Sequence, residues 1–138
     1  MKGIDKKRVI VTGAVQGIGR AVAERFLSEG ASVLLTDAAR AEVINDVVDS
    51  LEDRYPGLAF GTRIDMQDEK QVVDGFRYMQ EALGRCVVNN AGVNRQNPSH
   101  KFNTEDFDQV LGVNLRGASW PICIGGGDRG CFRVPCQR

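Results

Sequence analysis

Residues Val9 to Arg20 read VIVTGAVQGIGR, and this stretch decides the fold. A β-branched run ends in three glycines with the spacing G-x-x-x-G-x-G, and an amphipathic helical pattern follows at once. That order predicts a strand, a tight turn and a helix N-terminus whose free N–H groups and dipole favour a phosphate. Gly13 permits the turn, Gly17 lets the backbone approach a pyrophosphate, and Gly19 lets the helix pack against the strand.

Length and composition fit one globular domain. The chain has 138 residues, of which 42% are hydrophobic and 26% charged, and this predicts a folded protein with a real core. Eighteen basic and eighteen acidic residues cancel, so we expect no nucleic acid and no membrane surface as partners. There is no apolar run of membrane-spanning length, and the charged residues 1–8 lack the apolar region of a signal peptide.

The four cysteines do not form a framework around a core. Cys86 stands alone, and Cys123, Cys131 and Cys136 crowd the end of the chain. They also lack the C-x-x-C spacing of a zinc site. The sequence therefore predicts a reducing, cytoplasmic setting and no metal.

Strand-like and helix-like patterns alternate from Arg8 to about Gly117. The expected strands are 8–12, 32–36, 58–64 and 86–89. The expected helices bury Ile18, Val22, Phe26 and Leu27, then Val43, Val47, Val48 and Leu51, then Val72, Phe76 and Met79, and last Phe107, Val110, Leu111 and Leu115. Alternation of this kind predicts an α/β fold, a doubly wound, Rossmann-like parallel sheet, incomplete here, over residues 1–118.

The helix ends carry capping signals. Gly30 and Gly84 are expected to end the first and third helices. Asp68 and Gln71 resemble a capping box for the third helix. Thr104 is expected to cap the last helix, which has Glu105 and Asp106 in its first turn.

Asp37 ends the second expected strand, at about the 20-residue distance from the glycines that a dinucleotide site requires. An acid there accepts hydrogen bonds from the ribose hydroxyls of adenosine and repels a 2′-phosphate. No basic residue stands at positions 38 or 39, and Arg40 comes only after them. The pattern favours NAD over NADP. The alternative is an aspartate that caps the following helix.

Two further strand ends carry polar residues. Asp65 ends the third strand and could reach an adenine amino group, or it is a solvated turn residue. Residues 89–92, Asn-Asn-Ala-Gly, end the fourth strand. Small and amide residues there leave room for a cofactor and bond neighbouring strands, but an ordinary turn uses the same residues. Because ligands of such sheets bind beyond the carboxyl ends of the strands, these positions predict one site.

Asn114 lies on the apolar face expected for the last helix. A buried amide must find partners or cost about 1–3 kcal/mol. Two interpretations follow: a satisfied core asparagine, or a functional amide that interrupts the helix and holds a water.

Together, Thr-Gly-x-x-x-Gly-Ile-Gly at 12–19, Asp37, Asp65, the Asn-Asn-Ala-Gly turn and Val-Asn-Leu at 113–115 resemble the short-chain dehydrogenase/reductase family, in order over about residues 6–118. The resemblance implies a nicotinamide cofactor and hydride transfer between an alcohol and a carbonyl substrate. It also implies that Asn114 is catalytic and holds a water of the proton relay. The cofactor-binding residues it implies are Gly13, Gln16, Gly17, Ile18, Gly19, Asp37, Asp65, Met66, Asn90, Ala91 and Gly92.

Residues 94–101, with His100, resemble a loop of sugar and polyol dehydrogenases. His100 is a candidate substrate contact or a plain loop residue. The family also implies a subunit contact through the Asn114 helix, and a truncated sheet would add an unpaired edge.

The chain departs from the family at its acid and base. The family uses a Tyr-x-x-x-Lys pair after a strand serine, in which the lysine lowers the tyrosine pKa. Here Tyr55 is followed four residues on by Ala59, and Tyr78 by Ala82. Both tyrosines precede Asn114 instead of following it. We therefore expect no turnover by this chain alone.

Two other departures concern the strand at 86–89, which looks shortened, and residues 119–138, which are rich in Gly, Cys and Arg and have no regular period. We hypothesise that this tail arose from a frame shift, a missed splice or a truncated gene. The sequence predicts the NAD-binding portion of a dehydrogenase. Its alternatives are a non-enzymatic NAD-binding or subunit-interacting protein, or a non-functional truncated product.

Overall fold

The computed structural model describes residues 3–83, 86–96, 98, 101 and 103–120, with side chains except at 77–83. The four strands are β1 (Arg8–Thr12), β2 (Ser32–Asp37), β3 (Ala59–Arg63) and β4 (Cys86–Val88). The helices are α1 (Gly17–Ser28), α2 (Ala41–Glu52), α3 (Glu69–Leu83) and α4 (Thr104–Leu111), and a π-helix, η2 (Gly112–Gly117), continues α4.

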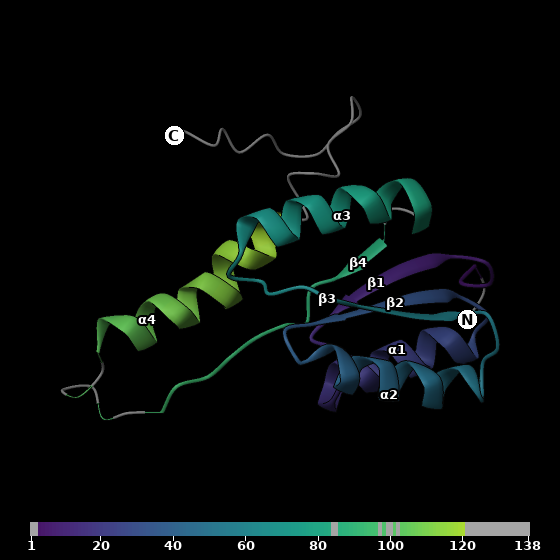
Figure 1. Ribbon diagram of the computed structural model, residues 1–138, viewed down its shortest axis with the longest axis horizontal. Helices are drawn as coiled ribbons and strands as arrows, with labels where there is room; N and C mark the ends of the chain where they lie inside the picture. Colours follow the sequence, from purple (N-terminus) through teal and green to yellow (C-terminus); the bar gives the residue numbers. More distant parts are fainter. Residues whose placement is uncertain (1–2, 84–85, 97, 99–100, 102, 121–138) are drawn as a thin grey trace.

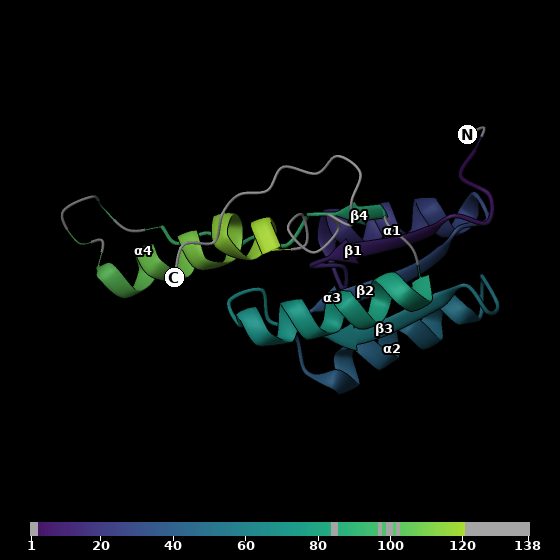
Figure 2. The same ribbon diagram turned by 90° about the horizontal axis from the view of Figure 1, so that it is seen from above.

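The strands form one parallel sheet in the order β3-β2-β1-β4. The helices α1 and α2 cover one face and α3 covers the other (Figures 1 and 2). The order changes direction at β1, since β2 and β4 lie on either side of it. Such sheets bind ligands beyond the carboxyl ends of the strands, at the point where the strand order changes direction. The predicted Rossmann-like fold is confirmed.

Two apolar clusters hold the layers together. Alternate residues of β1 point to opposite faces, as a strand requires: Val9 and Val11 pack with Leu27 of α1, while Ile10 packs with Phe76 of α3. All four of these β1 and α3 residues are essentially inaccessible to water. Burial on both faces explains why the strands read as continuous apolar runs.

The predicted helix faces need two local corrections. Ile18 is 78% exposed, because it lies in the first turn of α1 at the mouth of a pocket and not over the sheet. Val43 is 40% exposed, and its neighbour Ile44 packs in the core instead. Ile18 precedes the part of α1 that packs on the sheet, whereas α2 is oriented so that Ile44, and not Val43, faces the core.

The cap of α4 also differs from the prediction. Asn103, not Thr104, is the N-cap residue, and its Oδ1 accepts a hydrogen bond of 2.7 Å from the Asp106 N–H. Thr104 is the first residue of the helix. Asparagine and threonine both serve as caps, so adjacent candidates are not separated by residue type. The predicted ends at Gly84 and the side chain of Met79 lie outside the described part.

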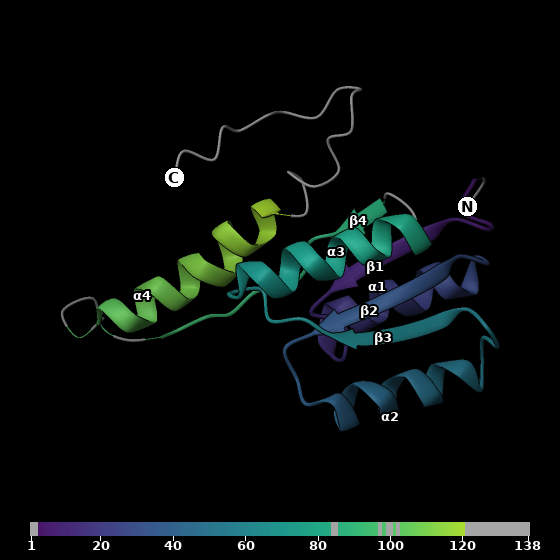
Figure 3. The same cartoon turned by 45° about the horizontal axis from the view of Figure 1, so that its top comes forward.

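The largest difference concerns the apolar face of the last helix. Phe107 is 52% exposed, Leu111 37% and Leu115 65%. The helix α4 extends away from the sheet, beyond the start of α3 (Figures 1 and 3). Asn114 is likewise exposed, so its prediction as a core amide is wrong. Periodicity identified an apolar stripe, but nothing among the described residues packs over it.

Candidate functional site

The turn after β1 has the strained backbone that its glycines predict. Gly13 and Gly17 have φ values of 63° and 57°, in the left-handed region where a side chain is disfavoured. A Cβ at Gly17 would meet nothing within 4 Å, so the space in front of this residue is open. Helix α1 starts here with Gln16 as N-cap residue and no side-chain cap. Its first N–H groups are therefore directed to the open space.

A network of hydrogen bonds connects this turn to the segment that follows β4. The buried Thr12 hydroxyl accepts from the N–H groups of Asn90 (3.1 Å) and Ala91 (2.9 Å). In return the Asn90 Nδ2 donates to the carbonyl oxygens of Thr12 (2.9 Å) and Gly13 (3.0 Å). These bonds fix the Asn-Asn-Ala-Gly segment against the glycine turn, and the ordinary-turn alternative does not account for them.

Gly19 fills the third glycine position because the backbone approaches it closely. A Cβ there would lie 2.2 Å from the Gly13 carbonyl oxygen and 2.4 Å from the Asn90 Nδ2. Side-chain atoms do not approach backbone this closely. The predicted close packing of α1 is therefore confirmed, and its partner includes Asn90 as well as the strand end.

Asp37 is the last residue of β2, and its carboxylate is held by backbone. Its Oδ2 accepts from the Val15 N–H at 3.3 Å and its Oδ1 accepts from the Ala39 N–H at 3.1 Å. The N-cap residue of α2 is Arg40, so the alternative that Asp37 caps the helix is wrong. Its carboxylate stands at the carboxyl end of the sheet, across the turn from Gly17.

Asp65 organises a short turn between β3 and α3. Its Oδ1 accepts from the Gln67 N–H (2.9 Å), and its own N–H donates to the Gln71 Oε1 (3.1 Å). The Asp68 carboxylate accepts from the Gln71 N–H (3.1 Å) and Nε2 (2.8 Å), which holds the pKa of Asp68 below its usual range. Asp68 and Gln71 thus cap α3 as predicted, except that Gln71 reaches back to Asp65 as well.

The helix is interrupted at Asn114. This residue lies within η2, and its amide forms two bonds with the backbone of Val93: Val93 N–H to Oδ1 at 2.8 Å and Nδ2 to Val93 O at 2.9 Å. Such π-helical turns occur often at functional sites. The predicted interruption is present, but the amide satisfies itself on a neighbouring segment at the protein surface.

Glycine also lets η2 approach the segment between β3 and α3. A Cβ on Gly117 would lie 2.2 Å from the Met66 carbonyl oxygen, so only glycine permits this approach. Val113, on the same turn, is 7% exposed and packs with Met66 in the cluster under α3. The segment 112–117 is thereby held against residues 65–67, and sequence patterns had not singled out Gly117.

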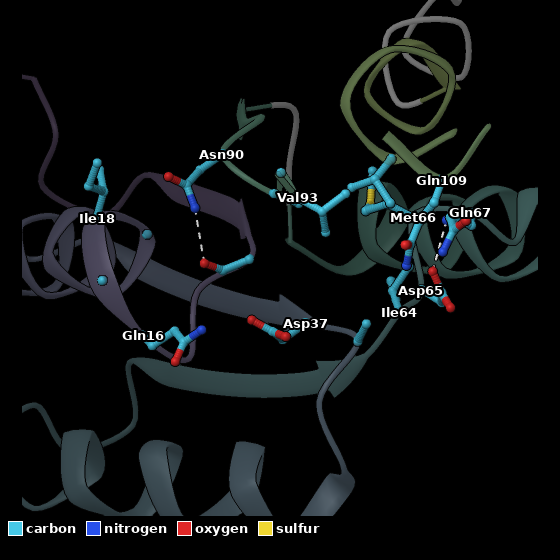
Figure 4. Close-up of a pocket in the computed structure, with 17 residues that line it drawn as sticks. Gln16, Ile18, Asp37, Ile64, Asp65, Met66, Gln67, Asn90, Val93 and Gln109 are labelled. Carbon is cyan, nitrogen blue, oxygen red and sulfur yellow. Dashed lines mark hydrogen bonds between the residues drawn. The ribbon is translucent and has the colours of Figure 1, made fainter. Parts of the chain in front are cut away.

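These segments enclose a pocket of about 560 Å³ at the carboxyl ends of the strands. Figure 4 shows Gln16 and Ile18 at one end of it, Asp65, Met66 and Gln67 at the other, and Asp37 between them. All the residues that the sequence predicts for cofactor binding line it. The structure adds Ala38, Ile64, Gln67, Val93, Gln109 and Val113. Asn114 does not line the pocket but holds Val93, which does.

Some predicted features fall outside this site. His100 and residues 121–138 lie outside the described residues. Across 3–83, 86–96, 98, 101 and 103–120, no cluster of His, Cys, Asp and Glu is placed to bind a metal. Within the same part of the chain, no helix combines the length and apolar character needed to cross a membrane.

Comparison with known proteins now identifies the family. A model of the short chain dehydrogenase family matches residues 7–122. The chain belongs to this family. The match covers β1 to η2 and ends just beyond the last described residue.

Relatives of this chain include enzymes for different substrates. Levodione reductase of Leifsonia aquatica is 36% identical over 112 residues, which are 79% of this chain and 42% of that protein. Meso-2,3-butanediol dehydrogenase of Serratia marcescens is 36% identical over 115 residues, or 82% of this chain and 44% of that protein. The chain thus spans less than half the length of these curated relatives.

Solved structures agree with the fold. A short-chain dehydrogenase/reductase from Burkholderia phymatum, in complex with NAD, has a TM-score of 0.81 and 30% identity, covering 90% of this chain and 44% of that one. A blue fluorescent protein from a metagenomic library, in complex with NADPH, has a TM-score of 0.81 and 26% identity, covering 90% of this chain and 51% of that one. Proteins of this shape therefore include both NAD and NADPH binders.

Proposed function

We propose that this chain binds a nicotinamide dinucleotide in the pocket at the carboxyl ends of its strands. The observation that carries the proposal is the open turn at Gly17, which joins an uncapped helix N-terminus to a pocket of about 560 Å³. An N–H-rich helix start attracts a pyrophosphate, and only a residue without Cβ leaves the space that the phosphates need. The NAD and NADPH held by similar structures support the same class of ligand.

Each side of the pocket has a role in this proposal. Gly13, Gly17 and Gly19, with Gln16 and Ile18, hold the pyrophosphate, and Asp37 accepts hydrogen bonds from the adenosine ribose. Asp65 and Met66 contact the adenine, while Asn90, Ala91 and Gly92 form the wall toward the nicotinamide. The Asp37 carboxylate repels a 2′-phosphate, so we propose that NAD is preferred over NADP. We also propose a reducing, cytoplasmic setting, as the spacing of the four cysteines predicts.

The family chemistry is hydride transfer between the bound nicotinamide and an alcohol or carbonyl substrate. The chain holds two tyrosines, Tyr55 and Tyr78, and neither is followed four residues on by lysine. Both also precede Asn114 in the chain. We propose that this chain alone binds cofactor but does not turn over, since neither tyrosine begins a Tyr-x-x-x-Lys pair, in which the lysine lowers the tyrosine pKa.

A titration with NADH, followed by fluorescence, tests the binding. The sharpest variant is Gly17→Ala, which places a methyl group in the open space, and we expect the dissociation constant to rise by about tenfold or more, the equivalent of about 1.4 kcal/mol. Gly57→Ala is the matched control, since Gly57 also has positive φ (74°) and an open Cβ position, but lies away from the pocket. Both variants bear the same backbone strain.

Saturable binding that Gly17→Ala weakens and Gly57→Ala leaves unchanged supports the proposal. Equal binding by both variants would contradict it. A chain that is folded by circular dichroism but binds no NADH would instead support a non-functional truncated product. Dehydrogenase turnover by the purified chain would contradict the proposed lack of an acid/base.

A second candidate function is association with another subunit. The exposed apolar stripe of Phe107, Leu111 and Leu115 favours it, because isolated apolar patches of this kind mark interaction sites. Sedimentation of the wild type beside Leu115→Lys tests it: loss of a dimer in the variant supports association through the Asn114 helix. If the wild type and Leu115→Lys both sediment as monomers, association through this helix is excluded.

A further inference from the structure

Arg63 stands beside the ribose end of the pocket, although no glycine motif or strand-end acid includes it. It is the last residue of β3 and pairs in register with Asp37 of β2. Its Nε donates to the carbonyl oxygen of Ala38 at 3.3 Å. Since Ala38 and Asp37 both line the pocket, the guanidinium is held at the rim where the Asp37 carboxylate lies.

The remaining donors of Arg63 are not consumed by the protein. Within the part of the chain that the structure describes, the Arg63 side chain makes no other hydrogen bond and no ion pair, and it is exposed. A guanidinium carries five N–H donors in a planar fork that matches the oxygens of a phosphate. Most of the guanidinium N–H donors of Arg63 therefore face solvent at the rim of the pocket.

Asp37, by contrast, is already engaged. Both of its oxygens accept backbone N–H groups, from Val15 and Ala39. These bonds neutralise part of the negative potential that would oppose a second anion. The rim thus presents one partly satisfied carboxylate and one cation with free donors, side by side on adjacent strands.

The geometry points to Arg63 as a cofactor-specificity residue that contacts a 2′-phosphate on the adenosine ribose. This inference rests on the proposed dinucleotide site. Charge-assisted hydrogen bonds from Arg63 to the 2′-phosphate offset the repulsion between that phosphate and Asp37. The ratio of NAD affinity to NADP affinity is therefore smaller than it would be with Asp37 alone. The contact comes from the neighbouring strand, and not from the residues directly after Asp37.

Arg40 is the competing cation. It is the exposed N-cap residue of α2, and it follows Asp37 by three positions in the sequence. Its backbone carbonyl accepts from Val43 and Ile44, but among the described residues no hydrogen bond joins its guanidinium to the rim. Arg63 is anchored to a residue that lines the pocket, so its fork is pre-organised and loses less entropy on binding.

Isothermal titration with adenosine 2′,5′-bisphosphate and with AMP tests the contact without the nicotinamide half. NADPH and NADH are titrated in parallel. For Arg63→Ala we expect binding of adenosine 2′,5′-bisphosphate and NADPH to weaken by about tenfold, with AMP and NADH changed by less than about twofold. Arg63→Lys should keep part of the effect, since it retains the charge but not the fork. Lys101→Ala controls for loss of an exposed cation elsewhere.

The outcomes separate the two claims. The inference is overturned if Arg63→Ala leaves the NADPH-to-NADH ratio unchanged, if Arg40→Ala alone removes it, or if the wild type binds NADH but not adenosine 2′,5′-bisphosphate. Failure of all four nucleotides to bind the folded chain overturns the proposed function, and this inference with it. Circular dichroism melts of each variant exclude loss of fold as the cause.

Discussion

Two ends of the same pocket are built in different ways. At the glycine-turn end, formed by Thr12, Gly13, Gly19, Asn90 and Ala91, buried hydroxyl, amide and backbone groups bond one another across β1, α1 and β4. At the helix end, formed by residues 112–117 and Val93, one exposed asparagine makes the main hydrogen-bonded link, and the adjacent Leu115 remains exposed. The first end is complete within this chain, whereas the second presents surface that more polypeptide could cover.

This difference matches the proposed division of labour. A dinucleotide needs a pre-formed cradle, because disorder in the cradle would subtract directly from the binding energy. The hydrogen bonds at the glycine-turn end agree with the proposed dinucleotide site there. The chain spans less than half the length of its curated relatives.

The largest effect should come from a methyl group at the most crowded glycine. Gly19→Ala places a Cβ 2.2 Å from a backbone oxygen that cannot rotate away, and we expect a loss of about 3 kcal/mol in the free energy of unfolding. Gly112→Ala, at the helix end, is the control, because its Cβ would approach no atom closer than 3.5 Å. Urea unfolding measures both. Equal losses would contradict the close backbone approach at Gly19.

A smaller effect is expected at the buried threonine hydroxyls. Thr12→Val leaves the N–H groups of Asn90 and Ala91 without their acceptor, which should cost about 2 kcal/mol of unfolding free energy. Thr36→Val is matched in register and burial (both 1% exposed), but its hydroxyl has no partner among the described residues. It should be neutral or stabilising in the same urea experiment. A costly Thr36→Val would indicate a bonded water at that hydroxyl.

At the helix end, loss of the asparagine amide should cost less. Asn114→Ala removes two hydrogen bonds to Val93 at an exposed position, so we expect a loss of about 1 kcal/mol and faster hydrogen exchange at the Val93 amide. Asn94→Ala, an exposed neighbour of Val93, serves as control. NADH affinity should change by less than about twofold in both. If NADH affinity fell strongly in Asn114→Ala and not in Asn94→Ala, the helix end would also contribute to NADH binding.

The smallest effect concerns pH and the start of α3. The Asp68 pKa is lowered by the backbone and side-chain hydrogen bonds from Gln71. A lowered folded pKa means that the ionised carboxylate stabilises the chain above its unfolded pKa, and that this stabilisation is lost as pH falls through the folded value. The urea midpoint of Asp68→Asn should therefore lie below the wild-type midpoint at pH 7, and the gap should narrow toward pH 3. Asp49→Asn, exposed on α2, should show no such narrowing.

Much of the pocket could be predicted from the sequence, since its lining is carried by local motifs. Gly13 and Gly17 stand in a turn whose strain depends on a few residues, and Asp37 and Asn90 stand at strand ends that a parallel sheet must gather at one edge. The exposure of Phe107 and Leu115 could not be predicted in this way. Periodicity identifies an apolar stripe, but only the rest of the fold decides whether anything packs on it.

Residue pattern alone determined the order of strands and helices, the glycine turn and the family to which the chain belongs, because these features depend on short spacings along the chain. Tertiary structure decided what distant segments do to one another. It set Asn114 against Val93, Gly117 against Met66 and Arg63 against Ala38, pairs that lie far apart in sequence or on different strands. Such contacts arise from packing of whole elements, and no local period encodes them.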